Sequence, residues 1–540
     1  MMHSQVRQRV SGLVLCTVLL WGGAGLRTAA ARSAPCTLSA LQVLAPAATT
    51  LTAVTRVPAT TTLPEYCQVD GYVTTPGEPG EANNQANFRV GLPTAWNHKF
   101  YFQGCGGRCG SLVPLDAGLT RGYASATTDT GHQAAVTDSL WAYNARTKEI
   151  DYGYRGIHVT TVAAKLLTQA YYGRPLRQAY FNGCSNGGRQ ALIEAQRYPE
   201  DFHGIIAGDP SLGTSGSLSS IWRYQTVLAD RDHYLPATKL SLLANAVLAD
   251  CDATDGLVDG LIDDPRQCTF DPVQLLCPAG TDAPDCLTAG QVETVWKIYA
   301  GPTNSAGEQL YPGYPMGHED DPTGWQLWIV GSNPDHVVEQ PDGTLAYTGT
   351  SPLMGDPPLG FAFLDDGLKY LSFEQDDPTY SYRFFNFDTD PPLFAFMGEI
   401  LNATDPQLVR FKAYGGKLIM YHGWADPAIS ALRTIEYAEE VVQAIGGKRQ
   451  TDQFFRLFLA PGMHHCSGGP GPNTFDTLTA LETWVEDGIA PTRIIASHST
   501  GGVVDRTRPL CPYPQVARYV GTGSIDQAQN FLCTPPAPAP

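Results

Sequence analysis

The sequence predicts an α/β protein whose mostly parallel sheet is interrupted by a large inserted domain. Short apolar runs alternate with helical patterns between about residues 88 and 207, and the alternation resumes after residue 417. Between these stretches, roughly from 211 to 405, the composition changes to Asp, Pro, Gly and aromatic residues with weak periodicity. A loop of that length without its own core would be unusual, so we interpret it as a domain.

The elements of the sheet follow from apolar runs and helical periodicity, taken in chain order. The first half predicts strands at 99–103, 123–127, 178–182 and 204–207, and helices at 158–171 and 187–197. The second half predicts strands at 417–421 and 454–459, and helices at 429–445 and 475–484. The predicted core therefore consists of 32–210 and 406–533, with 211–405 inserted between its two parts.

Both ends of the chain carry segments that we exclude from this core. Arg7 and Arg9, an apolar run at 13–21 and small residues at 28–31 predict a secretory signal at 1–31. A membrane anchor is the alternative, but the run is shorter than the roughly 20 residues that a span needs. We therefore expect a secreted or periplasmic protein, with no membrane partner. The proline-rich residues 534–540 predict a disordered tail.

The composition argues against a nucleic-acid partner. The chain has 35 Lys and Arg against 53 Asp and Glu, a net charge of −18, and no cluster of basic residues. Binding to nucleic acid draws much of its affinity from neutralised phosphates. Nothing in the sequence implies a protein partner.

The cysteines predict a disulfide framework. Removing Cys16, which lies in the predicted signal, leaves twelve of the 13 cysteines for an oxidising compartment. Spacing does not prove connectivity, and the pair within the Gly-rich segment 104–110 is the least certain. Local spacing favours Cys36 with Cys67, Cys105 with Cys109, Cys251 with Cys268, Cys277 with Cys286 and Cys511 with Cys533, which leaves Cys184 for Cys466.

Ser185 is the candidate nucleophile. It is the central residue of a Gly-x-Ser-x-Gly motif at 183–187, between the strand at 178–182 and a predicted helix. This is the context of the sharp strand-to-helix turn that exposes the nucleophile of α/β-hydrolases. The alternative is a structural serine beside the inert buried thiol of Cys184.

Asp426 and His465 are the candidate partners, because α/β-hydrolases place the acid and then the histidine after the serine. Asp426 follows the strand at 417–421, although it could be a turn residue or a helix cap before Pro427. Asp405 and Asp452 do not follow a strand in this order.

His465 follows the strand at 454–459, and His464 is its rival. A disulfide between Cys184 and Cys466 would hold His465 beside the serine, because bridged Cα atoms lie about 4.4–6.8 Å apart. We expect His422 and His132 to be structural histidines.

Two backbone amides are candidate donors to the oxyanion of an acyl-transfer reaction. One belongs to Asn186, directly after the candidate nucleophile. The other is assigned to Gly106, in the Gly-rich segment 104–110 that follows the strand at 99–103. An ordinary glycine turn is the alternative for this segment.

The chain resembles the tannase and feruloyl esterase family of secreted α/β-hydrolases, which also includes hydrolases of mono(2-hydroxyethyl) terephthalate. The likeness covers nearly the whole mature chain. It rests on residues 183–190, 195–202, 128–132 and 461–466 together with Asp426. The resemblance implies an α/β-hydrolase core with a large inserted lid domain, and a disulfide between Cys184 and Cys466.

The resemblance also implies a structural calcium ion. Residues 251–261 look like the family's calcium loop, with the carboxylates of Asp252, Asp255 and Asp259 and the carbonyls of Leu257 and Leu261 as ligands. Calcium takes 6–8 oxygen ligands, which fits such a set. Without the family, an ordinary series of turns is an equal alternative.

The family implies a small-molecule aromatic ester as substrate, and we rank hydroxycinnamate esters first, gallate esters second and terephthalate monoesters third. No arginine can be assigned to a terephthalate carboxylate from the sequence. A non-catalytic, calcium-stabilised binding protein is the alternative of another class, and a serine peptidase or acyltransferase shares the triad. Candidates for contact with an aromatic group are Tyr311, Tyr314, Trp325, Trp328, Tyr382, Phe384 and Phe385.

Overall fold

A nine-stranded sheet organises the computed structural model, which describes residues 33–536. Its strand order is β1-β2-β3-β5-β4-β6-β7-β10-β11. The pairs from β1 to β5 are antiparallel and those from β5 to β11 are parallel. The strands are β1 (Thr49–Val57), β2 (Tyr66–Thr75), β3 (Asn84–Pro93), β4 (Lys99–Gln103), β5 (Ala124–Thr128), β6 (Gln178–Cys184), β7 (Gly204–Gly208), β10 (Lys417–Gly423) and β11 (Phe455–Ala460).

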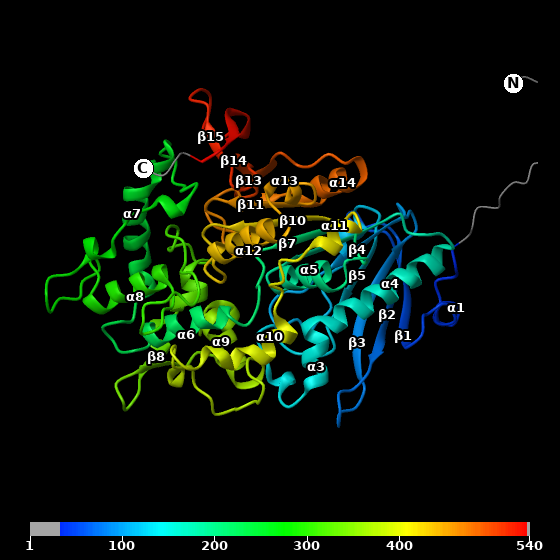
Figure 1. Cartoon of the computed structure of the whole chain (residues 1–540), viewed down its shortest axis with the longest axis horizontal. Coiled ribbons are helices and arrows are strands. Elements are labelled where there is room, and N and C mark those ends of the chain that lie inside the picture. The colour runs from blue at the N-terminus through cyan, green and yellow to red at the C-terminus, as the bar shows by residue number, and fades with distance from the viewer. Residues whose placement is uncertain (1–32, 537–540) are drawn as a thin grey trace, which may run out of the picture.

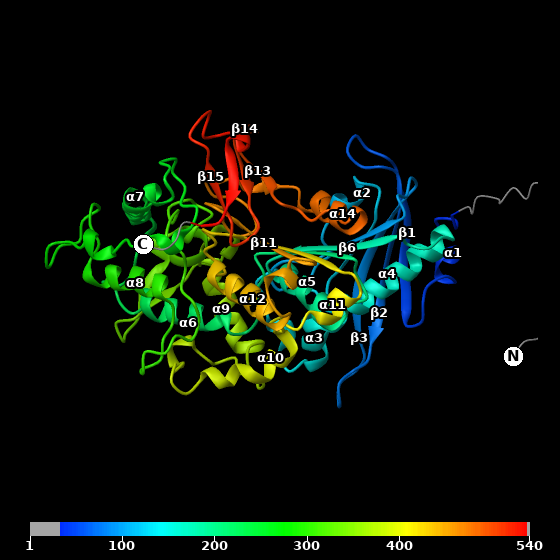
Figure 2. The same cartoon turned by 45° about the horizontal axis from the view of Figure 1, so that its top comes forward.

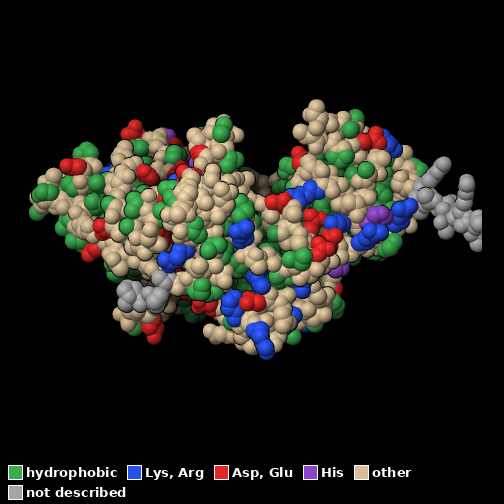
Figure 3. Space-filling view, turned by 90° about the horizontal axis from the view of Figure 1, so that it is seen from above, with side chains coloured by type: hydrophobic (Ala, Val, Ile, Leu, Met, Phe, Trp, Pro, Cys, Tyr) green, Lys and Arg blue, Asp and Glu red, His purple; other side chains and the backbone are tan. Residues whose placement is uncertain are grey.

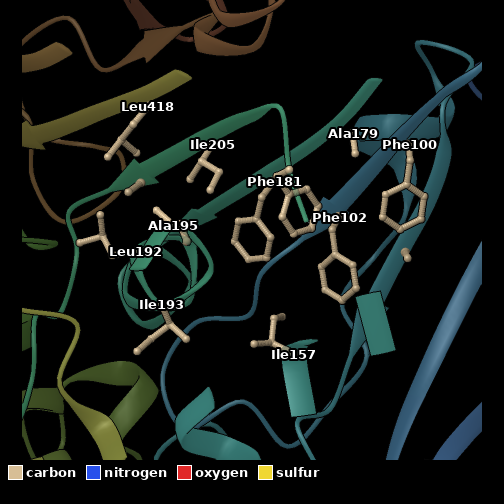
Figure 4. Close-up of a cluster of buried hydrophobic side chains, with 14 of the residues drawn as sticks. Phe100, Phe102, Ile157, Ala179, Phe181, Leu192, Ile193, Ala195, Ile205 and Leu418 are labelled. Atoms are coloured by element: carbon tan, nitrogen blue, oxygen red, sulfur yellow. The ribbon is translucent and has the colours of Figure 1, made fainter. Parts of the chain in front are cut away.

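Helices cover both faces of the sheet, because alternate strand residues point to opposite faces. Phe100 and Phe102 of β4 pack with helices α4, α5 and α12, whereas Tyr101 packs on the other face with α14. Figure 4 shows Leu192 and Ile193 of α5 beside Phe181 and Ile205 of the sheet. The helices of the core are α1 (Leu38–Gln42), α2 (Asp116–Leu119), α3 (Arg146–Ile150), α4 (Gly156–Tyr172), α5 (Asn186–Arg197), α11 (Val409–Ala413), α12 (Ala431–Ala444), α13 (Lys448–Thr451) and α14 (Thr477–Asp487).

The residues between β7 and β10 leave the sheet and form a second hydrophobic core. This core is built only from side chains between Leu218 and Phe394. The segment lies beside the sheet, at the left in Figures 1 and 2. Its elements are α6 (Gly216–Val227), α7 (Leu240–Cys251), α8 (Ala289–Ala300), β8 (Val337–Glu339), β9 (Leu345–Tyr347), α9 (Leu359–Tyr370) and α10 (Ala395–Leu401).

Two small antiparallel sheets complete the chain. One consists of β12 (Thr474–Phe475), β13 (Ile494–Thr500) and β14 (Val503–Leu510), and the other of β15 (Val516–Tyr519) and β16 (Phe531–Thr534). Thr534, which the sequence analysis assigned to the disordered tail, is the last residue of β16 and pairs with Val516. That assignment was wrong for this residue, because proline richness begins only after it. The predicted signal at 1–31 lies outside the described residues.

Six disulfides crosslink the described residues, and they are the five pairs that spacing favoured and the pair that these left over. They are Cys36–Cys67, Cys105–Cys109, Cys184–Cys466, Cys251–Cys268, Cys277–Cys286 and Cys511–Cys533. Within residues 33–536, no helix is long and apolar enough to cross a membrane. On the face shown in Figure 3, Lys and Arg side chains lie scattered among acidic ones, so this face has no continuous basic surface.

Candidate active site

Ser185 occupies a strained turn between β6 and α5. Its backbone φ is 63°, a left-handed value that a serine adopts only when its surroundings impose it. Glycines make the turn possible, because a Cβ on Gly183 would lie 2.3 Å from the Gly187 carbonyl oxygen and one on Gly188 equally close to that of Gly208. The structure therefore places Ser185 in the turn that its motif predicts.

The loop after β11 meets this turn. The disulfide between Cys184 and Cys466 brings their Cα atoms to 5.9 Å. Ser185 and His465 line the same cavity as a result. The bridge thus joins the two loops that carry the candidate nucleophile and the candidate base.

Asp426 lies directly behind the imidazole of His465. Nδ1 of His465 is 2.7 Å from Oδ2 of Asp426, and it donates its hydrogen to that oxygen. The other oxygen of Asp426 accepts the amides of Ala428 and Ile429 at 2.7 and 3.0 Å. The carboxylate is 2 % exposed, so its orientation is fixed by these partners.

A second histidine contacts the same carboxylate. Nε2 of His422 lies 3.2 Å from Oδ2 of Asp426 and 3.0 Å from the carbonyl oxygen of Ile429, so this nitrogen carries the hydrogen. Its other nitrogen is 2.8 Å from the hydroxyl of Thr434. His422 is fully buried and does not line the cavity, which agrees with a structural role.

The charges of this group shift its pKa values in opposite directions. Burial lowers the pKa of His465, but the Asp426 carboxylate outweighs burial and raises that pKa above its ordinary value. Burial raises the pKa of Asp426, whereas His465 and His422 outweigh it and hold that pKa well below its usual range. Asp426 is therefore an anion that orients His465 and stabilises its protonated form.

The Gly-rich segment 104–110 lies against the start of α5. The Cys105 amide donates to Oε1 of Gln190 at 3.1 Å, and the side-chain amide of Asn186 lies 3.1 Å from the sulfur of Cys109. Gly106 lines the cavity with Ser185 and Asn186. The segment thus has the position that an oxyanion-binding loop requires, next to the free amides at a helix N-terminus.

His132 supports this segment from behind. Its Nε2 lies 2.8 Å from the Arg108 carbonyl oxygen, and its ring stacks on Trp141 at 3.7 Å. Burial lowers the pKa of His132 to about 4, so it is neutral at physiological pH and Nε2 donates to that carbonyl. This contact agrees with the structural role expected from the sequence.

His464, the rival of His465, points away from the cavity. Its Nδ1 lies 2.9 Å from the Thr323 hydroxyl and its Nε2 lies 3.2 Å from the His318 carbonyl oxygen, both in the inserted segment. Its side chain is 1 % exposed. The geometry therefore favours His465 as the base.

The cavity over Ser185 has a volume of about 530 Å³ and lies between the core and the inserted segment. Of the aromatic candidates from the sequence, Tyr311, Tyr314 and Trp328 line it, and the Trp328 ring is 5.0 Å from that of His465. Trp325, Tyr382 and Phe385 are buried within the core of the inserted segment, and Phe384 is exposed. Phe363, Arg108 and Arg223 also line the cavity and were not predicted from the sequence, because no local pattern marks them.

In the predicted calcium loop, Asp252 accepts the amides of Asp259 and Gly260, and Asp255 accepts those of Leu257 and Asp263. Among the described residues, no three carboxylates of this loop bring an oxygen within 4.8 Å of one another. Burial, and the nearby charges of Asp259 and Asp252, raise the pKa of Asp255 to about 6. Asp263, which the sequence analysis did not include, is also buried there and has an oxygen without a hydrogen-bond partner. Arg508 lies 2.5 Å from Asp259 and neutralises part of this charge. A cation with oxygen ligands fits the remaining negative charge.

Comparisons with known proteins find relatives over most of the chain. The model of the family described as "Tannase and feruloyl esterase" matches residues 67–534. An uncharacterized esterase of Xanthomonas campestris is 37% identical, with 97% of this chain and 95% of that protein covered. The mono(2-hydroxyethyl) terephthalate hydrolase of Piscinibacter sakaiensis is 35% identical, with 88% and 85% covered. A probable feruloyl esterase of Arthroderma benhamiae is 31% identical, with 82% and 81% covered.

Solved structures show the same fold. Feruloyl esterase B from Aspergillus oryzae superposes with a TM-score of 0.77 at 24% identity, covering 92% of this chain and all of that chain. The tannin acyl hydrolase from Aspergillus niger gives 0.70 at 23% identity, covering 93% and 96%. An α/β-hydrolase core with a large insertion is therefore shared with these enzymes.

Proposed function

The chain belongs to the tannase and feruloyl esterase family and is a carboxylic ester hydrolase, and from this we propose that Ser185, His465 and Asp426 form its catalytic triad. The observation that carries the proposal is the 2.7 Å contact of Asp426 with His465 on a loop that a disulfide joins to the Ser185 turn. A binding protein that had lost catalysis would have no need of this buried acid–base pair.

In the proposed reaction, Nε2 of His465 takes the Ser185 proton as Oγ attacks the ester carbonyl. The amides of Asn186 and Gly106 donate to the oxyanion of the tetrahedral intermediate. The histidine then gives its proton to the departing alcohol, which leaves an acyl-enzyme. Water, deprotonated by His465, attacks this acyl-enzyme and releases the acid.

The proposed substrates are esters of aromatic acids. Relatives named as feruloyl esterases and a mono(2-hydroxyethyl) terephthalate hydrolase support this class. The rings of Tyr311, Tyr314, Trp328 and Phe363 in the cavity can pack on an aromatic acyl group. We rank hydroxycinnamate esters first, gallate esters second and terephthalate monoesters third.

We further propose that a calcium ion stabilises the loop at 252–261. Asp252, Asp255 and Asp259 would supply carboxylate oxygens, and Leu257 and Leu261 carbonyl oxygens. The ion would offset the repulsion between these carboxylates. It would thereby stabilise the conformation of the loop that the Cys251–Cys268 bridge closes. Six disulfides and the predicted signal at 1–31 support export from the cytoplasm.

A substrate panel tests the proposed reaction. The wild-type protein and Ser185→Ala would be compared on methyl ferulate, methyl gallate and mono(2-hydroxyethyl) terephthalate, with Ser217→Ala as the matched control in the same cavity. We expect wild type and control to hydrolyse at least one ester, and Ser185→Ala to lose about 10⁶-fold in kcat. Undiminished turnover by Ser185→Ala would eliminate the proposed nucleophile. A matched amide hydrolysed faster than its ester would indicate a peptidase.

A further inference from the structure

The charged side chains that line the cavity are all basic. They are Arg108, Arg189 and Arg223, which share the cavity with the candidate base His465, and no Asp or Glu lines the cavity within the described chain. The whole protein, in contrast, carries a net charge of −18. The cavity is thus a local region of positive charge in an acidic molecule, which favours an anionic ligand.

Arg189 belongs to the scaffold of the site. Its Nε donates to the side-chain oxygen of Asn186 at 2.7 Å, and its two other nitrogens donate to the carbonyl oxygens of Gly153, Leu401 and Tyr152 at 2.8 to 3.1 Å. Because four of the five N–H donors of this guanidinium are taken by the protein, Arg189 has a single donor left and cannot bind a carboxylate through two hydrogen bonds.

Arg223, from α6, is also buried, but its hydrogen bonds are longer and fewer than those of Arg189. Its side chain is among the largest fully buried ones, with the residue 1 % exposed. Its contacts are long: 3.4 Å to the Tyr314 hydroxyl, 3.3 Å to the Pro427 carbonyl oxygen and 3.4 Å to the Ser220 hydroxyl. Its Nε has no hydrogen-bond partner. Among residues 33–536, no carboxylate lies within ion-pair distance of it, and its guanidinium lies over the neutral rings of Tyr224 and Tyr314 at 5.0 and 5.5 Å.

A buried guanidinium that has neither an anionic partner nor a full set of short hydrogen bonds is costly, and a bound anion would remove this cost. Its planar fork matches the two oxygens of a carboxylate. Arg223 reaches Pro427, the residue after Asp426, so it lies close to the catalytic acid as well as on the cavity. Arg108 also has an Nε without a hydrogen-bond partner and a guanidinium over an aromatic ring, that of Phe363. It is less suited because it is only half-buried and donates to the Phe363 carbonyl oxygen at 3.1 Å.

We propose that the ester substrate carries a free carboxylate in addition to the scissile bond, and that Arg223 binds this carboxylate. The proposal rests on the esterase function above and narrows its substrate class. The carboxylate belongs either to the acid part, as in a monoester of an aromatic dicarboxylic acid, or to the alcohol part, as in a hydroxycinnamate ester of a hydroxy acid. Both give Arg223 the same ligand.

Matched pairs of esters test the proposal and distinguish these two sources. Monomethyl terephthalate would be compared with methyl 4-carbamoylbenzoate, which replaces the acid-side carboxylate by a neutral amide. Feruloyl quinate would be compared with its quinate methyl ester, which neutralises the alcohol side. We expect kcat/KM to be higher for the charged member of one pair by about tenfold or more, since a hydrogen bond between ionised partners is worth about 1.5–3 kcal/mol.

Variants then assign the preference to Arg223. Arg223→Met should remove it, Arg223→Lys should retain part of it, and Arg231→Met, a control in the same inserted segment but outside the cavity, should keep it in full. Equal kcat/KM within both pairs, or a preference that survives Arg223→Met, would overturn the proposal. Failure of the wild type on all four esters and on methyl ferulate would instead count against the esterase function.

A measurement on the wild type covers the case in which Arg223→Met does not fold. Benzoate and benzamide have the same shape and differ in charge. Benzoate should inhibit hydrolysis of methyl ferulate competitively, with an inhibition constant about tenfold or more below that of benzamide. Equal inhibition by the two compounds would contradict a carboxylate site.

Discussion

Cys184 and Cys466 are 282 positions apart in the chain, and the disulfide between them holds their Cα atoms at 5.9 Å. Each cysteine is the sequence neighbour of one member of the proposed triad. Catalysis should therefore depend on this bridge more than on any of the other five.

Removal of the bridge in the double variant Cys184→Ala, Cys466→Ala should lower kcat/KM by about 100-fold at a temperature where the protein is folded, because displacement of a catalytic group by about 1 Å can cost that much. Circular dichroism would establish the folded range. The control is Cys277→Ala, Cys286→Ala, a bridge in the inserted segment. A loss of activity that merely follows unfolding in both variants would contradict the local role.

Replacement of the acid in Asp426→Asn should reduce kcat by about 10⁴-fold with a small change in KM, because the amide no longer holds His465 in the productive tautomer. Steady-state kinetics on the best ester measure this. Asp405→Asn is the matched control, since Asp405 is exposed and its carboxylate accepts only the Gln407 amide. A fall in both variants would point to a general loss of stability.

The pH dependence of kcat/KM should show an acid limb, because His465 must be neutral to accept the Ser185 proton. Asp426 raises the pKa of His465, so activity should fall as the pH drops through a value above the ordinary 6.5. In Asp426→Asn, burial is opposed only by the weaker influence of Asp209, so the pKa of His465 and the midpoint of the residual activity should move to lower pH. A midpoint that stays in place would show that another group titrates.

Chelation of calcium should lower the thermal midpoint of the protein. At a free calcium concentration 100 times the dissociation constant, the ion adds about 2.7 kcal/mol to the free energy of unfolding. Differential scanning calorimetry with and without chelator measures the shift. Addition of calcium should restore the midpoint, and Asp252→Asn should respond less. No change on chelation of the wild type would contradict the site.

Two neighbouring glycines should respond differently to alanine. A Cβ on Gly107, where φ is +56°, would lie 2.3 Å from a Val136 methyl, whereas one on Gly106 would meet nothing within 4 Å. Gly107→Ala should shift the segment 104–110 and lower kcat, while Gly106→Ala keeps its amide and should fold with an unchanged thermal midpoint. Equal kcat for Gly107→Ala and wild type would argue against an oxyanion role for this segment.

Local patterns predicted the elements that carry the site. The strand at 99–103 coincides with β4, and the elements around Ser185 differ from β6 and α5 by at most two residues at each end. Buried parallel strands and amphipathic helices give such signals because their burial follows a regular period. β1, β2 and β3 were missed. β1 lies at the edge of the sheet and is largely exposed, and β2 alternates buried with half-buried residues, so neither contains a continuous apolar run.

The lining of the cavity could not be predicted in the same way. Arg223, Trp328 and Phe363 come from separate elements of the inserted segment, and only tertiary packing brings them near His465. The inserted segment also contains short helices with weak periodicity, so the sequence does not show which of these helices pack against one another. For this reason the arginine that the cavity places near the triad was not assigned.

The inserted segment leaves the sheet after β7 and returns at β10, and these two strands are hydrogen-bonded neighbours. Its entry and exit are therefore anchored side by side on two largely buried strands of the sheet. The inserted segment can therefore change in sequence and structure while the proposed catalytic residues on the sheet keep their positions. Substrate selectivity and catalytic chemistry can then evolve separately. A chimera that carries the inserted segment of a relative should acquire the substrate selectivity of that relative.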